Sequence, residues 1–176
     1  MIIVLSPAKT LDYSSSENIS DFSSPEFLNK SKNLIKQIAK LKDVKFYEGL
    51  GSVYDKTQRL RKLSGMLAVE FNLNKEKAEI AASISKSDLC SDLVNEYPDL
   101  QGLLGKYFAL SQGFEEDVSN AVSDHYLPLG NNSMTSKKPI SYVVAISDKI
   151  DTLVGFFMIN EKPTSSKDPF ALRRSA

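Results

Sequence analysis

Three residue types that often carry chemistry are nearly missing: the 176-residue sequence has no tryptophan, one cysteine and one histidine. A single cysteine, Cys90, excludes an internal disulfide and a thiolate zinc site, so we expect it to be a small buried apolar residue. A single histidine, His125, leaves no Ser-His-acid arrangement to propose. It also supplies too few nitrogen ligands for metal-assisted hydrolysis, so we predict no metal site.

Net charge is also absent, because 22 lysines and arginines balance 22 acidic residues. No overall field therefore draws the protein towards nucleic acid, and any RNA contact must be local. Basic residues do cluster in KTQRLRK (Lys56 to Lys62), at Lys137 and Lys138, and in the C-terminal tail. The ordinary interpretation of such clusters is a solvated helix face.

Long apolar runs are missing too, since none reaches the roughly 20 residues that a membrane-spanning helix needs. The start, MIIVLSPAKT, has no basic region ahead of its apolar core and is too short for a signal peptide. We therefore expect a cytoplasmic protein with no membrane partner.

Most of the chain shows the helical period. We expect a helix after the cap Ser24, a linker with two glycines over residues 44–51, and a helix capped by Ser52 with Asp55 near its start. The motif GLGS (49–52) is expected to be a turn and cap, because it lacks the lysine and strand of a phosphate loop. Further helices are predicted from Lys75 (capped by Asn74) towards Leu89, over 99–110 with Gly102 and Gly105 as weak points, over 115–127, and from Pro139 to Ile159.

The first six residues, MIIVLS, instead form an apolar β-branched run typical of a buried strand. We find no convincing strand from residue 52 onward, so this strand has no sheet to join. The predicted fold is mainly α, a helical bundle with a short N-terminal strand and helix appended. The mismatch suggests that the two ends differ in origin.

Several segments resemble the β subunit of the bacterial two-subunit glycine–tRNA ligase: KFYEGLGSVYDKTQRLRKLSGMLA, SKSDLCSDLVNEYPDLQGLLGKYFAL, EEDVSNAVSDHYLP, AISDKIDTLVGFF and KPTSSKDPFALRR. They cover residues from about 41 to 176, in family order. The resemblance implies ATP-dependent attachment of glycine to its tRNA. In the family the α subunit forms the adenylate with ATP, while the β subunit recognises glycine tRNA and completes an α2β2 assembly. We expect this chain to be an internal piece without a complete active site or a cofactor of its own.

The opening segments IIVLSPAKTLDY and PEFLNKSKNLIK resemble a second family, the YaaA peroxide-stress proteins, over about residues 1–40. This resemblance implies the alternative function of a DNA-binding stress protein. The expected organisation is an incomplete YaaA-like segment (1–43) joined to a truncated ligase domain (44–176). We expect marginal stability and poor packing of the first forty residues on the rest.

The matching ligase region is similar to HD-type helical domains, in which a His-Asp pair and a later Asp hold a metal. At these positions the sequence has Ser87 in place of the histidine, then Asp88, and Asp148 in AISDKI. The resemblance thus implies a degenerate metal site, and we expect Asp88 and Asp148 to act as helix caps or salt-bridge partners. His125 matches no ligand position, and we expect it to be partly exposed near a helix end.

The tail KPTSSKDPFALRR offers candidate RNA-backbone contacts, because arginine and lysine bind phosphate. The candidates are Lys162, Lys167, Arg173 and Arg174. The alternative is a purely structural tail, in which Asp168 caps a helix with Pro169 at its first position. Phe170 and Leu172 would then pack inward and the arginines would be solvated.

Overall fold

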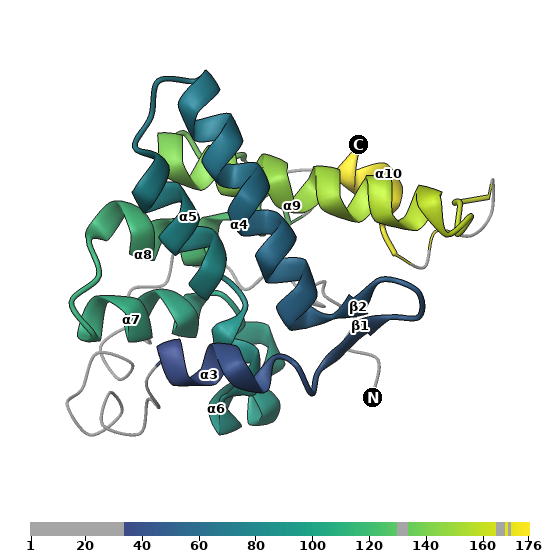
Figure 1. The fold of residues 1–176 in the computed structure, drawn as a ribbon. Helices are drawn as coiled ribbons and strands as arrows, with labels where there is room; N and C mark the ends of the chain where they lie inside the picture. The colour runs from purple at the N-terminus through teal and green to yellow at the C-terminus, as the bar shows by residue number, and fades with distance from the viewer. Residues whose placement is uncertain (1–33, 130–133, 165–167, 169) are drawn as a thin grey trace.

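The computed structural model describes residues 34–129, 134–164, 168 and 170–176, and helices dominate this part of the chain (Figure 1). The mainly α prediction is confirmed, whereas the strand expected over MIIVLS lies outside the described residues. The elements are α3 (Leu34–Lys40), β1 (Lys45–Tyr47), β2 (Gly51–Ser52), α4 (Val53–Glu70), α5 (Lys75–Ile84), the 3₁₀ helix η1 (Ser87–Cys90), α6 (Asp92–Glu96), the 3₁₀ helix η2 (Pro98–Leu100), α7 (Leu103–Ser111), α8 (Glu116–Asp124), α9 (Pro139–Met158) and α10 (Leu172–Ser175).

Residues 44–51, predicted as a plain linker, form most of a small β-hairpin. β1 and β2 pair antiparallel, with Lys45 opposite Ser52. Gly49 and Gly51 have φ angles of +79° and +82°, a region that glycine enters without steric cost. The two glycines therefore close the turn, and the linker prediction is wrong in that the segment contains paired strands, with a shift of register between Lys45 and Tyr47.

Helix starts agree well with the predicted caps. The Ser52 side chain accepts a hydrogen bond from the Asp55 N–H, and the Asp55 carboxylate accepts one from the Ser52 N–H, so α4 begins with a capping box. The Asn74 side chain accepts from the Lys77 N–H at the start of α5. α5 ends at Ile84 rather than running on towards Leu89, because the chain tightens there into η1.

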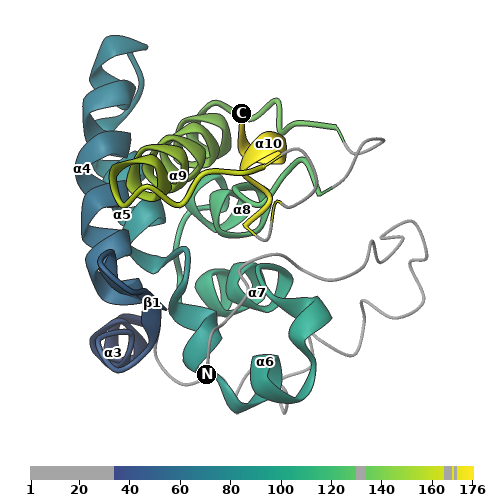
Figure 2. The same ribbon diagram turned by 90° about the vertical axis from the view of Figure 1, so that its right-hand side faces the viewer.

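The helices α4, α5, α8 and α9 surround the core. α4 lies in front of α9 in Figure 1 and packs against both α5 and α9, while α8 contacts α5, α7 and α9. Turning the molecule shows α9 nearly end-on, with α4 on one side and α8 on the other (Figure 2). Among the described residues, no helix is both long and apolar enough to cross a membrane.

The helix α3 packs closely on this bundle. Leu34 and Leu41 are completely buried, and α3 contacts η1 and α5. The Gln112 side chain also accepts a hydrogen bond from the Leu34 N–H. The expectation that the first forty residues pack poorly is therefore wrong for α3, and the residues before it lie outside the described part.

Candidate functional site

The basic tail lies against the C-terminal part of α9. Lys162 and Arg173 are exposed, and the Arg173 guanidinium donates a hydrogen bond to the Thr164 carbonyl. Lys167 and the side chain of Arg174 are outside the described residues. The Asp168 carboxylate accepts hydrogen bonds from the N–H groups of Leu172 and Arg173 at 2.8 and 3.0 Å. The predicted helix with Asp168 as its cap and Pro169 as its first residue is wrong, because α10 begins at Leu172 with Ala171 in the cap position.

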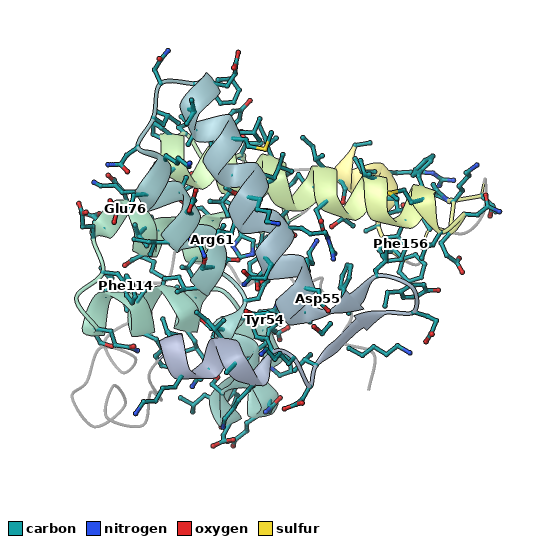
Figure 3. All side chains as sticks on the ribbon, in the orientation of Figure 1. Tyr54, Asp55, Arg61, Glu76, Phe114 and Phe156 are labelled. Carbon is teal, nitrogen blue, oxygen red and sulfur yellow. The ribbon has the colours of Figure 1, made fainter. Side chains whose placement is uncertain are left out.

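An aromatic cluster holds this tail in place; we use the name for Phe46, Tyr47, Phe156 and Phe170. The Phe170 ring stacks on the Phe156 ring with centroids 4.2 Å apart, and it meets the Tyr47 ring edge-on at 5.0 Å. Phe156 projects from α9 towards the hairpin (Figure 3). The inward packing predicted for Phe170 and Leu172 is confirmed, since Leu172 is buried and Phe170 is partly buried against the core.

A second group of side chains lies inside the bundle; we call it the buried charge cluster: Lys56, Lys86, His125, Asp148 and Asp151. The Asp148 carboxylate is shared by two ammonium groups, with the Lys56 Nζ at 2.8 Å from Oδ1 and the Lys86 Nζ at 3.1 Å from Oδ2. Both lysines are only 1% exposed. Burial of ions at this depth is tolerated only when they are paired.

Asp151, one turn further along α9, extends the cluster towards the surface. Its carboxylate contacts the Lys56 Nζ at 3.0 Å and binds the Arg59 guanidinium through two hydrogen bonds. Thr152 accepts a further hydrogen bond from Lys56. Lys56 and Arg59 belong to KTQRLRK, so the prediction of a fully solvated helix face is wrong for Lys56, which faces α9.

His125 was expected to be partly exposed, but it is completely buried. Its Nδ1 lies 2.9 Å from the Val122 carbonyl oxygen, an arrangement in which Nδ1–H donates and leaves Nε2 as an acceptor. The Lys86 Nζ is 2.7 Å from that Nε2 and lies over the Tyr126 ring, 4.0 Å from its centroid. The reason for this burial is its position on the helix, because His125 keeps helical φ and ψ angles at the end of α8 and lies on the buried side that also carries Ala121 and Val122.

Of the three HD-type positions, Ser87 and Asp88 serve the backbone. The Ser87 hydroxyl donates to the Ile84 carbonyl, and Asp88 Oδ2 accepts from the Gly102 N–H at 2.7 Å. Gly102 has φ +83°, and a Cβ on Gly105 would lie 3.0 Å from Asp88 Oδ2. The two glycines that weaken the predicted helix thus allow α7 to approach Asp88.

Electrostatics fix the protonation of the cluster at neutral pH. Burial would raise the pKa of Asp148, but Lys56 and Lys86 together hold it far below its usual range. Burial lowers the pKa of Lys86 to about 8 against the attraction of Asp148. Burial and then the charge of Lys86 keep the pKa of His125 well below its usual value. At pH 7 the cluster therefore contains an ionised Asp148, a protonated Lys86 and a neutral His125.

These contacts do not suit an HD-type metal centre. Ser87 has no ligand nitrogen, and both oxygens of Asp148 already contact ammonium groups. Within the described ranges, no three His, Cys, Asp or Glu side chains are grouped so as to hold a metal ion. We derive no metal chemistry from these residues. In the structure Asp88 accepts a hydrogen bond from the Gly102 N–H next to the start of α7, and Asp148 pairs with the ammonium groups of Lys56 and Lys86.

Sequence comparisons with known proteins place this chain among the subunits of aminoacyl-tRNA synthetases. Residues 28–176 match the family described as glycyl-tRNA synthetase beta subunit. The chain is 48% identical over 136 residues to the glycine–tRNA ligase beta subunit of Paracoccus denitrificans, covering 77% of this chain and 20% of that protein. It is 45% identical over 139 residues to the Rhodospirillum centenum protein of the same name, covering 77% and 20%. The chain therefore belongs to the glycyl-tRNA synthetase beta subunit family, and it spans about a fifth of the length of these relatives.

Proposed function

We propose that this chain is a helical module of a glycine–tRNA ligase beta subunit that contributes to tRNA recognition and to assembly with an α subunit. The observation that carries the proposal is the family match over residues 28–176. Relatives that are 45–48% identical carry the name of that ligase subunit. The chain itself would contain no complete active site, and ATP would be used by the α subunit of an α2β2 enzyme.

The tail supports an RNA contact in particular. Lys162 and Arg173 are exposed, and the aromatic cluster fixes the segment that carries them. A tethered guanidinium loses less conformational freedom on binding phosphate than one on a mobile tail. Lys167 and Arg174 belong to the same proposed contact by sequence.

The test is binding of the chain to glycine tRNA and to a non-cognate tRNA across a salt series. We expect tighter binding to glycine tRNA and an affinity that falls as salt rises. Equal and feeble binding to both tRNAs would contradict the recognition role. Co-elution with a separately expressed α subunit in gel filtration tests the assembly role independently.

Paired variants localise the RNA-binding surface. Lys162→Ala with Arg173→Ala should weaken tRNA binding and reduce the salt slope by about 1 for each phosphate that is no longer bound. The matched control is Lys62→Ala with Lys75→Ala, which removes two exposed charges from α4 and α5, away from α10 in Figures 1 and 2. Equally weakened binding in the two variants would indicate a diffuse charge effect rather than recognition by the tail.

A further inference from the structure

The helix α9 turns its charged side chains towards the rest of the protein. Its charged residues are Asp148, Lys149 and Asp151. The two carboxylates bind cations from α4 and from Lys86, and the Lys149 ammonium donates hydrogen bonds to the carbonyls of His125 and Leu127. The hydroxyl groups of the helix also donate hydrogen bonds within the protein, from Ser141, Ser147 and Thr152. No charge of α9 is therefore left for the side that faces away from the bundle.

That side of α9 is apolar and exposed. We call it the outer stripe: Tyr142, Ile150, Val154, Phe157 and Met158. Their exposed fractions run from 38% to 80%. At 3.6 residues per turn these positions fall on one half of the helix surface. All but Tyr142 lie in the second half of α9, which extends past α4 in Figure 1.

This distribution is typical of a helix that is covered on both sides. A surface helix normally turns its polar residues outward, whereas a helix that is apolar all round is normally buried. Exposed apolar patches mark sites where another surface docks. Nucleic acid and anionic membranes are bound through lysine and arginine, and the outer stripe contains neither. The surface that complements it is therefore an apolar surface of a protein.

We infer that the outer stripe packs against a part of the β-subunit polypeptide that lies outside this chain. The matched segment makes up 20% of the Paracoccus denitrificans relative, so most of that polypeptide is available to cover the helix. A segment of the same polypeptide is present at high effective concentration, whereas a second copy of this chain must associate from solution. The inference rests on the proposed function in one respect, that the chain is a module of a longer β subunit.

The experiment compares maleimide labelling at one position of the outer stripe in two proteins, this chain and the full-length Paracoccus denitrificans β subunit purified without an α subunit. Cysteine replaces Val154 here and the aligned residue there, and peptide mass spectrometry separates the new thiol from Cys90. We expect labelling at least about tenfold slower in the full-length protein at every protein concentration, because a covered thiol reacts only after local opening. The matched control is Lys62→Cys on the exposed side of α4, with its aligned position, and it should react at similar rates in the two proteins.

Three results would overturn the inference. The first is protection of the stripe position that does not exceed protection of the control position. The second is labelling of Val154→Cys in this chain that slows as its concentration rises, which would assign the stripe to a second copy. The third is protection in the full-length protein that appears only after an α subunit is added.

A second measurement uses Val154→Asp, which places a charge in the outer stripe. It should leave the Tm of this chain unchanged, because the side chain is exposed, and the aligned substitution should lower the Tm of the full-length relative, because the charge is buried without a partner. An unchanged Tm in both proteins would contradict the inference. Neither measurement involves tRNA, so a failure of the proposed tRNA recognition would leave both results interpretable.

Discussion

The buried charge cluster and the aromatic cluster both attach α9 to its neighbours, but by different physics. In the first, each lysine must meet a specific oxygen or nitrogen, because an unpaired buried charge is costly. In the second, the rings of Tyr47, Phe156 and Phe170 gain stability from buried area and edge or stacked contacts, which tolerate small displacements. The charge cluster therefore sets where α4 and α9 meet, while the aromatic cluster holds the hairpin and tail against them.

The largest expected effect comes from breaking the charge cluster at its centre. Asp148→Asn leaves Lys86 without its carboxylate partner and Lys56 with only Asp151, so we expect a decrease of about 3–5 kcal/mol in the free energy of unfolding, measured by urea denaturation. Asp151→Asn is the matched control, since Lys56 keeps Asp148 and Arg59 can turn towards water. A decrease as large in Asp151→Asn would show that Asp148 is not central.

Substitutions in the aromatic cluster should also reduce stability strongly, but only through the loss of packing. Phe156 is 3% exposed and touches the other three rings, so Phe156→Ala should cost about 3 kcal/mol in the same denaturation experiment. Its sequence neighbour Phe157 is 49% exposed, and Phe157→Ala should change stability by about 0.5 kcal/mol or less. Similar costs in the two variants would contradict the packing assigned to α9.

The two clusters also differ in how far the sequence predicts them. Helical period, the caps of α4 and α5 and the inward packing of Phe170 and Leu172 follow from local pattern, and these predictions are confirmed. The charge cluster depends on contacts between distant helices, which one sequence does not reveal. A signal was present nonetheless: Lys56 falls on the same face of its helix as Val53 and Leu60, and a cation among buried apolar residues needs a buried anion.

The position of His125 is a second example of a side-chain contact that one sequence does not reveal. Its place before Pro128 predicts a helix end, and α8 does end there. Whether the ring then turns outward or inward depends on Lys86 and Asp148, which come from two other segments. The sequence therefore predicts the element but not the direction of the side chain.

The two clusters should also differ in how the stability of the protein depends on acid pH, which is a smaller effect. His125 stays neutral in the folded state because its pKa is lowered, whereas the unfolded chain takes up that proton below about pH 6.5. The free energy of unfolding should therefore decrease as the pH is lowered below about 6.5, by about 1.4 kcal/mol per pH unit. Burial raises the pKa of Asp88 to about 6, although the hydrogen bond from the Gly102 N–H acts to lower it. Below pH 6 the folded state therefore takes up a proton at Asp88 that the unfolded chain takes up only in the usual aspartate range. Between these pH values this proton offsets the further loss of stability caused by His125.

Two variants test this balance by urea denaturation at several pH values. Asp88→Asn removes the offset, so its free energy of unfolding should continue to decrease as the pH is lowered from 6 to 4. The free energy of unfolding of His125→Gln should instead increase relative to wild type as the pH is lowered over the same range. Phe156→Ala is the control from the aromatic cluster, and its pH profile should run parallel to that of wild type. Parallel profiles for all four proteins would contradict the protonation states assigned to the charge cluster.

The smallest expected effect distinguishes buried from exposed charge pairs. Arg61 of α4 reaches towards α5 (Figure 3), with its Nε 3.3 Å from Glu79 Oε2 and its side chain 54% exposed. Arg61→Gln should cost about 0.5 kcal/mol or less at low ionic strength. That cost should vanish in 1 M NaCl, where the Debye length is about 3 Å, because water and salt reach the pair.

The destabilisation caused by Asp148→Asn should persist in the same salt, because Lys56 and Lys86 are shielded from solvent. Lys62→Gln, at the next position on α4, changes net charge by the same amount as Arg61→Gln and serves as the control. If 1 M NaCl reduced the cost of Asp148→Asn to that of Arg61→Gln, ions would have access to the interior pair. The charge cluster would then be an exposed network, and its proposed role in fixing the contact between α4 and α9 would be wrong.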